Sequence, residues 1–189
     1  MSVSLLARLV APSQRERVLL RAQSSYDGPV EGHPDKLAAI REAVQVFDDG
    51  GVDYALIGGL AVGIRSGIPR ATLDVDFAVV STVDRGWLTD QFTRGDFSAG
   101  GQFAHSVNLR HESGEPVQLA FDAGFDPMIL RAERIDLGGL AVRVVTTVDL
   151  IAMKRRAAAD PARRRSKALR DQADIALLEG DVPDPDEGW

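Results

Sequence analysis

Residues 73–80, with the sequence LDVDFAVV, place two aspartates two positions apart inside an otherwise apolar run. If this run is a strand, successive side chains point to opposite faces, so Asp74 and Asp76 share one face and the apolar residues between and around them share the other. Two carboxylates side by side repel each other, and a hard divalent cation between them relieves that repulsion. The run therefore predicts a half-buried strand whose polar face holds a metal ion.

Length and composition set further limits. With 189 residues, 44% of them hydrophobic, the chain can form one domain with a substantial core, or one domain with a small helical appendage. It has no cysteine, which excludes disulfide scaffolds and cysteine-based zinc sites. The N-terminal run LLARLV is too short for a signal-peptide core and contains Arg8, so we expect no export signal, no membrane span and a cytoplasmic protein.

The order of predicted elements alternates between helix and strand, which is typical of an α/β fold. Helices are expected over residues 4–10, 34–49, 59–67, 83–94, 126–133, 147–159 and 161–180. Strands are expected over residues 52–58, 72–80, 103–111, 116–122 and in a pair interrupted by Gly138 and Gly139 that ends with residues 140–146. We divide the chain into an N-terminal helix and loop (1–33), a core (34–146), a C-terminal helical segment (147–180) and a disordered acidic tail (181–189).

A third carboxylate follows from the strand predicted over residues 116–122. Its apolar and polar residues alternate, so Asp122 lies at the strand end on the face opposite the core. If this strand pairs beside residues 72–80 with those faces aligned, Asp74, Asp76 and Asp122 converge and suit one or two magnesium ions. In the alternative interpretation, Asp122 faces solvent before a glycine turn.

Gly58 and Gly59 lie between a predicted strand and a predicted helix, upstream of the aspartates. Glycines at such a turn let backbone N–H groups approach a phosphate, and the helix N-terminus adds partial positive charge. Arg65 and Arg70 follow, as candidate phosphate ligands; a plain surface position is the alternative for Arg65. The segment predicts a triphosphate site beside a metal site.

The block from Gly58 to Asp76 resembles the nucleotidyltransferase superfamily of the DNA polymerase β type, in particular the branch of AbiEii-type toxins. In that branch a Gly-Gly motif precedes Arg-x-Ser/Thr-x-Asp-x-Asp, which Arg70, Thr72, Asp74 and Asp76 match.

The C-terminal segment is similar to a later part of the same family. Lys154 stands where the family has a helix lysine, and Asp171 and Asp174 match a Lys-Asp-x-x-Asp element in which Arg170 replaces the usual lysine. The resemblance covers residues 52–178.

The resemblance implies a mixed β-sheet flanked by helices and a nucleotide site in which two magnesium ions, or manganese in their place, are held by carboxylates. A nucleoside triphosphate would donate a nucleotidyl group to an acceptor hydroxyl and release pyrophosphate. The branch also implies a toxin with an antitoxin protein as its partner. The implied metal ligands are Asp74, Asp76 and Asp122, of which Asp122 would also activate the acceptor; Lys154 would contact the triphosphate, and Gly58, Gly59, Arg65, Arg70, Thr72, Asp171 and Asp174 would complete the nucleotide site.

Several of these residues have structural alternatives. Lys154 can be an exposed cation near a helix C-terminus, and Thr72 can simply begin a strand. Asp171 and Asp174 can pair with Lys167 and Arg170 in their own helix, although base before acid is the less favourable order. The apolar stripe expected for that helix consists of Leu169, Ala173, Ala176 and Leu177.

The acceptor is open between classes. The formal net charge is −6, yet basic residues are concentrated in residues 154–170, either as a solvated helix face or as a contact surface for RNA such as a tRNA end. An antibiotic or other small-molecule nucleotidyltransferase is the second class, disfavoured because Leu60 and Leu73 stand where such enzymes usually carry an aromatic residue and a histidine. A non-catalytic binding module is the third, disfavoured because repelling carboxylates without a metal cost stability.

Overall fold

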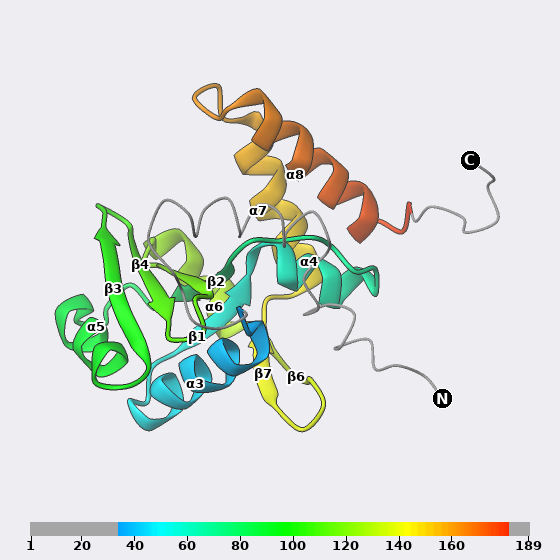
Figure 1. The fold of residues 1–189 in the computed structure, drawn as a ribbon. Helices are drawn as coiled ribbons and strands as arrows, with labels where there is room; N and C mark the ends of the chain where they lie inside the picture. Colours follow the sequence, from blue (N-terminus) through cyan, green and yellow to red (C-terminus); the bar gives the residue numbers. More distant parts are fainter. Residues whose placement is uncertain (1–33, 182–189) are drawn as a thin grey trace.

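The computed structural model describes residues 34–181, and the helix expected over residues 4–10 and most of the acidic tail lie outside this range. Seven strands form one mixed sheet in the order β3-β4-β5-β2-β1-β7-β6 (Figure 1). The α/β class and the mixed sheet expected from the sequence are confirmed. The elements are α3 (Lys36–Asp49), β1 (Tyr54–Ile57), α4 (Gly58–Ser66), β2 (Val75–Val79), α5 (Arg85–Arg94), β3 (Phe97–Gln102), β4 (Ser106–His111), β5 (Pro116–Ala120), the 3-10 turn η1 (Ala123–Phe125), α6 (Asp126–Leu130), β6 (Glu133–Asp136), β7 (Ala141–Val144), α7 (Thr147–Ala159) and α8 (Arg165–Leu178).

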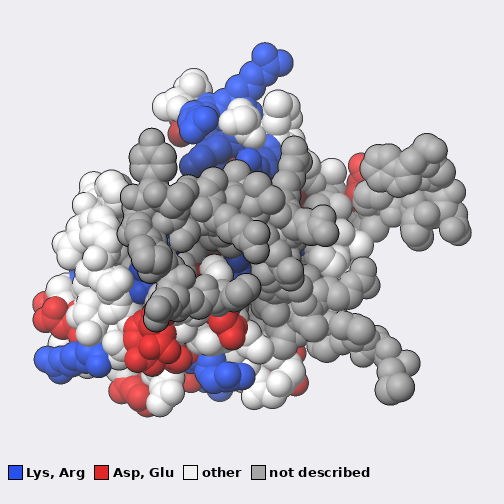
Figure 2. Space-filling model, in the orientation of Figure 1, with Lys and Arg blue, Asp and Glu red and all other residues white. Residues whose placement is uncertain are grey.

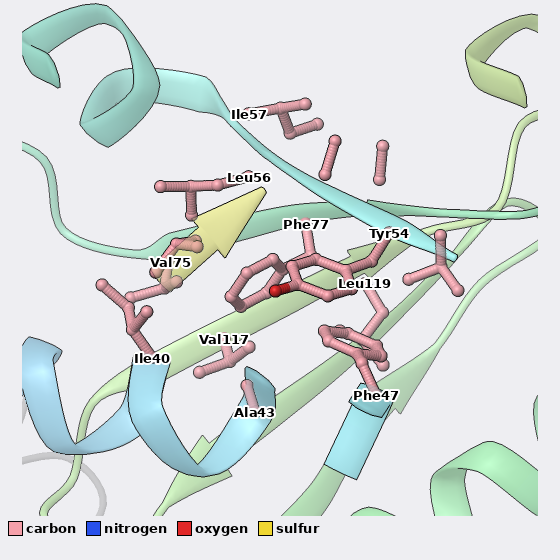
Figure 3. Packing of buried hydrophobic residues seen from close by; sticks show 14 of the residues in the cluster. Ile40, Ala43, Phe47, Tyr54, Leu56, Ile57, Val75, Phe77, Val117 and Leu119 are labelled. Carbon is pink, nitrogen blue, oxygen red and sulfur yellow. The ribbon is translucent and has the colours of Figure 1, made fainter. Parts of the chain in front are cut away.

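One face of the sheet packs against α3 and α5. The apolar residues of α3 recur at helical spacing, and Phe47 stacks on Tyr54 with ring centroids 4.5 Å apart and meets Phe77 edge to face. Figure 3 shows how Ile40 and Phe47 of α3 lie against side chains of β1, β2 and β5. This core fixes which faces of β2 and β5 are buried, and so which faces carry polar residues.

On the other face of the sheet, α4 packs against β1 and β2. Helix α7 packs against α4, and α8 packs on these two helices (Figure 1). The predicted cap of α7 is confirmed, because Thr146 accepts a hydrogen bond from the Asp149 backbone N–H and donates one to the Asp149 carboxylate at 2.7 Å. The division into a core and a helical segment at residue 147 stays a prediction.

Several elements are shorter than expected, and β3 and α8 differ from expectation most. Strand β3 was not predicted, since its run FSAGGQ has two glycines and no alternation; five of its six residues are exposed, and backbone pairing with β4 makes it a strand. Helix α8 begins at Arg165, four residues later than expected, because residues 161–164 form a turn in which the Arg163 N–H donates to Asp160 O. Within residues 34–181, no helix is long and apolar enough to cross a membrane.

Candidate active site

Asp74 and Asp76 lie at the start of β2, on the α4 side of the sheet. Asp76 pairs in register with Ile57 of β1 and with Gln118 of β5. Asp74 precedes the first strand residue, and Thr72 Oγ1 donates a 3.2 Å hydrogen bond to its carboxylate. The strand is thus shorter than predicted, and Leu73, expected on the apolar face, is 39% exposed. The two carboxylates are nevertheless neighbours.

The two glycines between β1 and α4 are packed against motif side chains. Gly58 has φ +69°, and a Cβ there would overlap Oδ2 of Asp76 and lie 2.8 Å from its Cγ. A Cβ on Gly59 would overlap the Arg70 guanidinium and lie 2.9 Å from the Thr72 Cβ. The absence of a side chain at both positions is therefore what lets Asp76, Arg70 and Thr72 approach the first turn of α4.

Charged side chains form a buried network between α7, α8 and the loop before β2. Lys154 Nζ donates a 2.9 Å hydrogen bond to Asp171 and forms an ion pair with Asp174 Oδ2 at 2.8 Å. Arg70 forms an ion pair with Asp174, and Arg163 forms one with Asp171 at 2.6 Å. Each buried carboxylate thus has two cationic partners from other segments, which offsets the cost of desolvation.

The site's electrostatics follow from this crowding. Burial and the neighbouring Asp74 charge raise the pKa of Asp76 to about 7, against the attraction of Lys154, Arg70 and Lys167. Burial would also raise the pKa of Asp171, but Lys154 and Arg163 outweigh it and lower that pKa below its usual value. The nearby cations therefore do not fully balance the negative charge of the Asp74–Asp76 pair, and this pair favours binding a further cation. The negative charge of Asp171, in contrast, is already balanced by its ion pairs.

The donor set of Asp74 and Asp76 fits a divalent cation. Mg²⁺ usually takes one or two protein carboxylates and completes its shell with water and substrate phosphates. Among the residues that the structure describes, no group of three or more His, Cys, Asp or Glu side chains converges to hold a metal. The expected three-carboxylate set is therefore not formed.

Asp122 is the residue that fails to converge. It lies beyond the end of β5, four residues past Gln118, which is about 13 Å along the strand direction. Its exposed carboxylate accepts a 2.8 Å hydrogen bond from the Gly124 N–H and caps η1. This corrects the expectation that Asp122 joins Asp74 and Asp76, and supports its alternative as a residue before a glycine turn.

Arg65 does not face the carboxylate pair either. Its guanidinium donates 2.8 Å hydrogen bonds to the carbonyl oxygens of Val144 and Val145 and forms a 2.7 Å ion pair with Glu133. These contacts engage all three of its nitrogens and tie α4 to the end of β7. The structure thus gives Arg65 a structural position rather than one at the site.

The buried face of α8 is only in part the one that was expected. Of the predicted apolar stripe, Ala176 and Leu177 are partly buried and Leu177 packs against the core, but Leu169 is 54% exposed and Ala173 is exposed as well. Asp171 and Asp174, in contrast, are 2% and 1% exposed. The pairing of these acids with Lys167 and Arg170 is replaced by pairing with Lys154, Arg70 and Arg163. Lys154 itself is buried, not an exposed cation at the end of its helix.

Basic side chains gather around the connection between α7 and α8. Figure 2 shows this group as a blue surface at the end of the helical pair. Arg164, Arg165, Lys167 and Arg170 are exposed, while Arg163 next to them is held by Asp171. Arg155 and Arg156 of α7 are exposed as well, with Arg155 paired to Glu179, so the basic surface at the connection itself consists of these four residues.

Three residues of the site were not predicted from the sequence: Gln118, Asn108 and Arg163. Gln118 lies beside Asp76, Asn108 lies beside Gln118, and Arg163 completes the ion pairs of Asp171. The alternation in residues 116–122 did assign Gln118 to the Asp76 face, but only the strand register places it next to that aspartate.

This chain matches a family of known proteins and is similar to solved structures. The family model described as "Nucleotidyl transferase AbiEii toxin, Type IV TA system" matches residues 43–187. A comparison with curated protein sequences gives no match. Among solved structures, an antigenic nucleotidyltransferase-like protein from Paracoccidioides brasiliensis is 27% identical, with a TM-score of 0.54 over 79% of this chain and 78% of that chain.

Two more distant structures share the fold. ANT(2″)-Ia in complex with adenylyl-2″-tobramycin is 15% identical, with a TM-score of 0.54 over 77% of this chain and 90% of that chain. The Megavirus polyadenylate synthase is 13% identical, with a TM-score of 0.52 over 92% of this chain and 37% of that chain. At these identities the likeness extends to the fold alone.

Proposed function

We propose that this chain, which belongs to the AbiEii family of nucleotidyltransferase toxins, transfers a nucleotidyl group from a nucleoside triphosphate to a hydroxyl of RNA with the help of a divalent cation. Nucleotidyl transfer is the activity of the family; the cation and the acceptor are what we add. The observation that carries the proposal is the Asp74–Asp76 pair against the Gly58–Gly59 turn, with Arg70 and Lys154 beside it.

The chain's own residues divide the work of binding. Asp74 and Asp76 would hold Mg²⁺, or Mn²⁺ in its place, which supplies charge neutralisation at the reacting phosphate. Arg70 and Lys154 would bind the triphosphate. In the reaction, the acceptor hydroxyl oxygen forms a bond to the α-phosphorus and its proton is released to water. The bond between the α-phosphorus and the bridging oxygen breaks, and pyrophosphate leaves with the electron pair of that bond.

Asp171 and Asp174 are positioning residues in this proposal. They contact Lys154, and Asp174 also contacts Arg70, so they fix where two cations stand before a triphosphate arrives. Long cationic side chains lose much rotamer freedom when they bind a ligand, and holding them in place beforehand lowers that cost.

RNA is favoured as the acceptor by the four exposed basic residues at the connection between α7 and α8. Each would neutralise a phosphate of a single strand, whereas the same surface repels a cationic antibiotic. An antitoxin protein is the partner expected for a toxin of this family, and the cytoplasm, where nucleoside triphosphates and RNA occur together, is the expected compartment. A small-molecule acceptor is the second candidate.

The test is transfer of label. The protein is incubated with each labelled nucleoside triphosphate, Mg²⁺ and total RNA, and Asp76→Asn is run in parallel. We expect label on RNA with the wild type and none with Asp76→Asn. RNA that stays unlabelled with every nucleoside triphosphate would refute the RNA acceptor, and equal labelling by Asp76→Asn would refute the role of the carboxylate pair.

A further inference from the structure

A pair of amide side chains continues the polar row that begins at Asp76. In the sheet, Asp76 stands beside Gln118 of β5, and Gln118 stands beside Asn108 of β4. Gln118 Nε2 donates a 3.0 Å hydrogen bond to Asn108 Oδ1, and both side chains are half-buried. Because neighbouring strands are about 4.8 Å apart, the first amide is within reach of any group that binds at the carboxylate pair.

The chemistry of these amides differs from that of a third carboxylate. A carboxamide neither takes a proton nor neutralises a cation at neutral pH, but it offers one acceptor oxygen and two N–H donors. Their mutual hydrogen bond uses one donor of Gln118 and one lone pair of Asn108. Among residues 34–181 no further partner uses Gln118 Oε1, its second N–H or the Asn108 Nδ2 group. Donors and acceptors thus remain side by side for a ligand.

The surrounding face is neutral or basic. The residues of β4 and β5 that share it with Asp76 include no acid: they are Ser106, Asn108, Arg110, Pro116, Gln118 and Ala120. A cationic acceptor would therefore find no countercharge here beyond the carboxylate pair itself. A neutral, hydroxyl-bearing group matches the surface better.

We infer that Gln118 and Asn108 bind the sugar of the acceptor beside the carboxylate pair, and that they select a ribose with two free hydroxyls, as at the 3′ end of RNA. This inference rests on the proposed transfer to RNA and names the group that is recognised. Each ribose hydroxyl both donates and accepts a hydrogen bond, so one is held by the amides while the other is free to attack. The held hydroxyl is what distinguishes an RNA end from a DNA end.

The experiment compares two acceptors and three proteins. The acceptors are a short single-stranded oligoribonucleotide and the same oligonucleotide with a 2′-deoxy 3′-terminal residue. The proteins are wild type, Gln118→Met, which keeps the length of the side chain and removes the amide, and Gln102→Met, an equivalent change at an exposed glutamine of β3. Labelled nucleoside triphosphates with Mg²⁺ report transfer, and calorimetry with Mn²⁺ and ATP reports donor binding.

We expect wild type and Gln102→Met to use the ribose-ended acceptor with kcat/KM about tenfold higher than the deoxy-ended one, the size of one lost hydrogen bond. The substitution Gln118→Met should raise KM for the ribose-ended acceptor about tenfold. The variant should then use both acceptors with equal kcat/KM, and it should bind Mn²⁺ and ATP as wild type does. If thermal melting shows that Gln118→Met is unfolded, Asn108→Leu takes its place with the same expected loss of discrimination.

The two ways of failing are distinct. Wild type that binds Mn²⁺ and ATP but labels neither oligonucleotide would overturn the RNA acceptor. Wild type that labels RNA, together with a folded amide variant that still prefers the ribose end tenfold, would overturn the role of the amides and leave the proposed transfer standing.

Discussion

The carboxylate of Asp76 rests on Gly58, in the space that any side chain at residue 58 would need. Gly58 also has a left-handed backbone, with φ +69°. The backbone conformation and the contact with Asp76 thus constrain this residue independently. Gly51 allows their effects to be measured apart, because it has the same kind of backbone, with φ +60°, and nothing lies within 4 Å of the position that an alanine Cβ would take there.

Gly58→Ala should therefore lower both the stability and the metal binding of the protein, whereas Gly51→Ala should lower its stability alone. Both variants carry the backbone cost of a left-handed alanine, about 1–2 kcal/mol of unfolding free energy. Only Gly58→Ala also displaces the Asp76 carboxylate, so only this variant should lose Mn²⁺ affinity in calorimetry and nucleotidyl transfer. Equal Mn²⁺ affinity in the two variants would show that Asp76 does not depend on this contact.

Asp76→Asn should stabilise the protein when no metal is present. Because the pKa of Asp76 in the folded state is about 7, above its ordinary value of 3.8, the folded protein binds the extra proton between these pH values, and this contribution to stability is lost as pH rises through 7. Three pKa units correspond to at most about 4 kcal/mol. In urea unfolding with a chelator present, the free energy of unfolding of Asp76→Asn minus that of wild type should rise from about pH 4 to pH 7 and stay constant above about pH 7.

The same variant should respond differently to metal. Mg²⁺ should raise the melting temperature of wild type at about pH 8 and leave that of Asp76→Asn nearly unchanged, because binding to the folded state alone is stabilising. A Mg²⁺-dependent rise of equal size in Asp76→Asn would contradict the assignment of Asp76 as a ligand.

Gln118→Glu and Asp122→Asn test where a third carboxylate can act. Gln118→Glu places an acid beside Asp76, so we expect Mn²⁺ to bind about tenfold or more tightly, as an added negative ligand attracts a divalent ion. Asp122→Asn should leave Mn²⁺ affinity unchanged, since Asp122 lies beyond the end of β5. Loss of Mn²⁺ binding in Asp122→Asn would restore the three-carboxylate site.

Lys154→Met removes the cation that Asp171 and Asp174 share. Asp171 then keeps only Arg163 and Asp174 keeps only Arg70, so each buried carboxylate loses one charged hydrogen-bonding partner, and we expect a loss of about 1.5–3 kcal/mol in the free energy of unfolding. Arg155→Met is the matched control, because Arg155 is exposed and pairs with Glu179 at the surface, where an ion pair contributes less than about 1 kcal/mol. Similar losses in the two variants, measured in urea, would show that the network is solvated.

Arg164 and Arg165 test the basic surface without disturbing the site. Replacing both by alanine should weaken binding of single-stranded RNA and reduce the slope of log affinity against log salt by about 0.7 for each lost phosphate contact. Arg163 is kept because it pairs with Asp171. The control replaces Arg41 and Arg94, exposed on α3 and α5, and should leave both quantities unchanged; an equal effect of the two double variants would indicate unspecific attraction.

Local patterns predicted most of the fold. The spacing of apolar residues predicted α3, and Thr146 with Asp149 predicted the start of α7, because these features are decided within a few residues of chain. Strand β3 escaped because FSAGGQ has no pattern of its own and pairs through its backbone. A strand of this kind is specified by its neighbour.

The site was predictable in part for the same reason. The alternation of residues 116–122 gives the face of Asp122 but not its level along β2, which depends on the register between two strands about 40 residues apart in sequence. Apolar spacing likewise failed in α8, since Asp171 and Asp174 are buried by ion pairs whose partners lie as far as 17 and 104 residues away. Such pairs leave no periodic signal.

The acidic face of α8 has a consequence for how that helix finds its place. An apolar helix face that docks slightly out of place loses packing contacts but leaves no charge buried without a partner. Asp171 and Asp174 differ, since a slip of one position rotates both acids by about 100° and buries a carboxylate without a cation. The ion pairs thus make the docking of α8 specific to one position, because a misplaced helix pays the cost of a buried, unpaired carboxylate in addition to lost contacts.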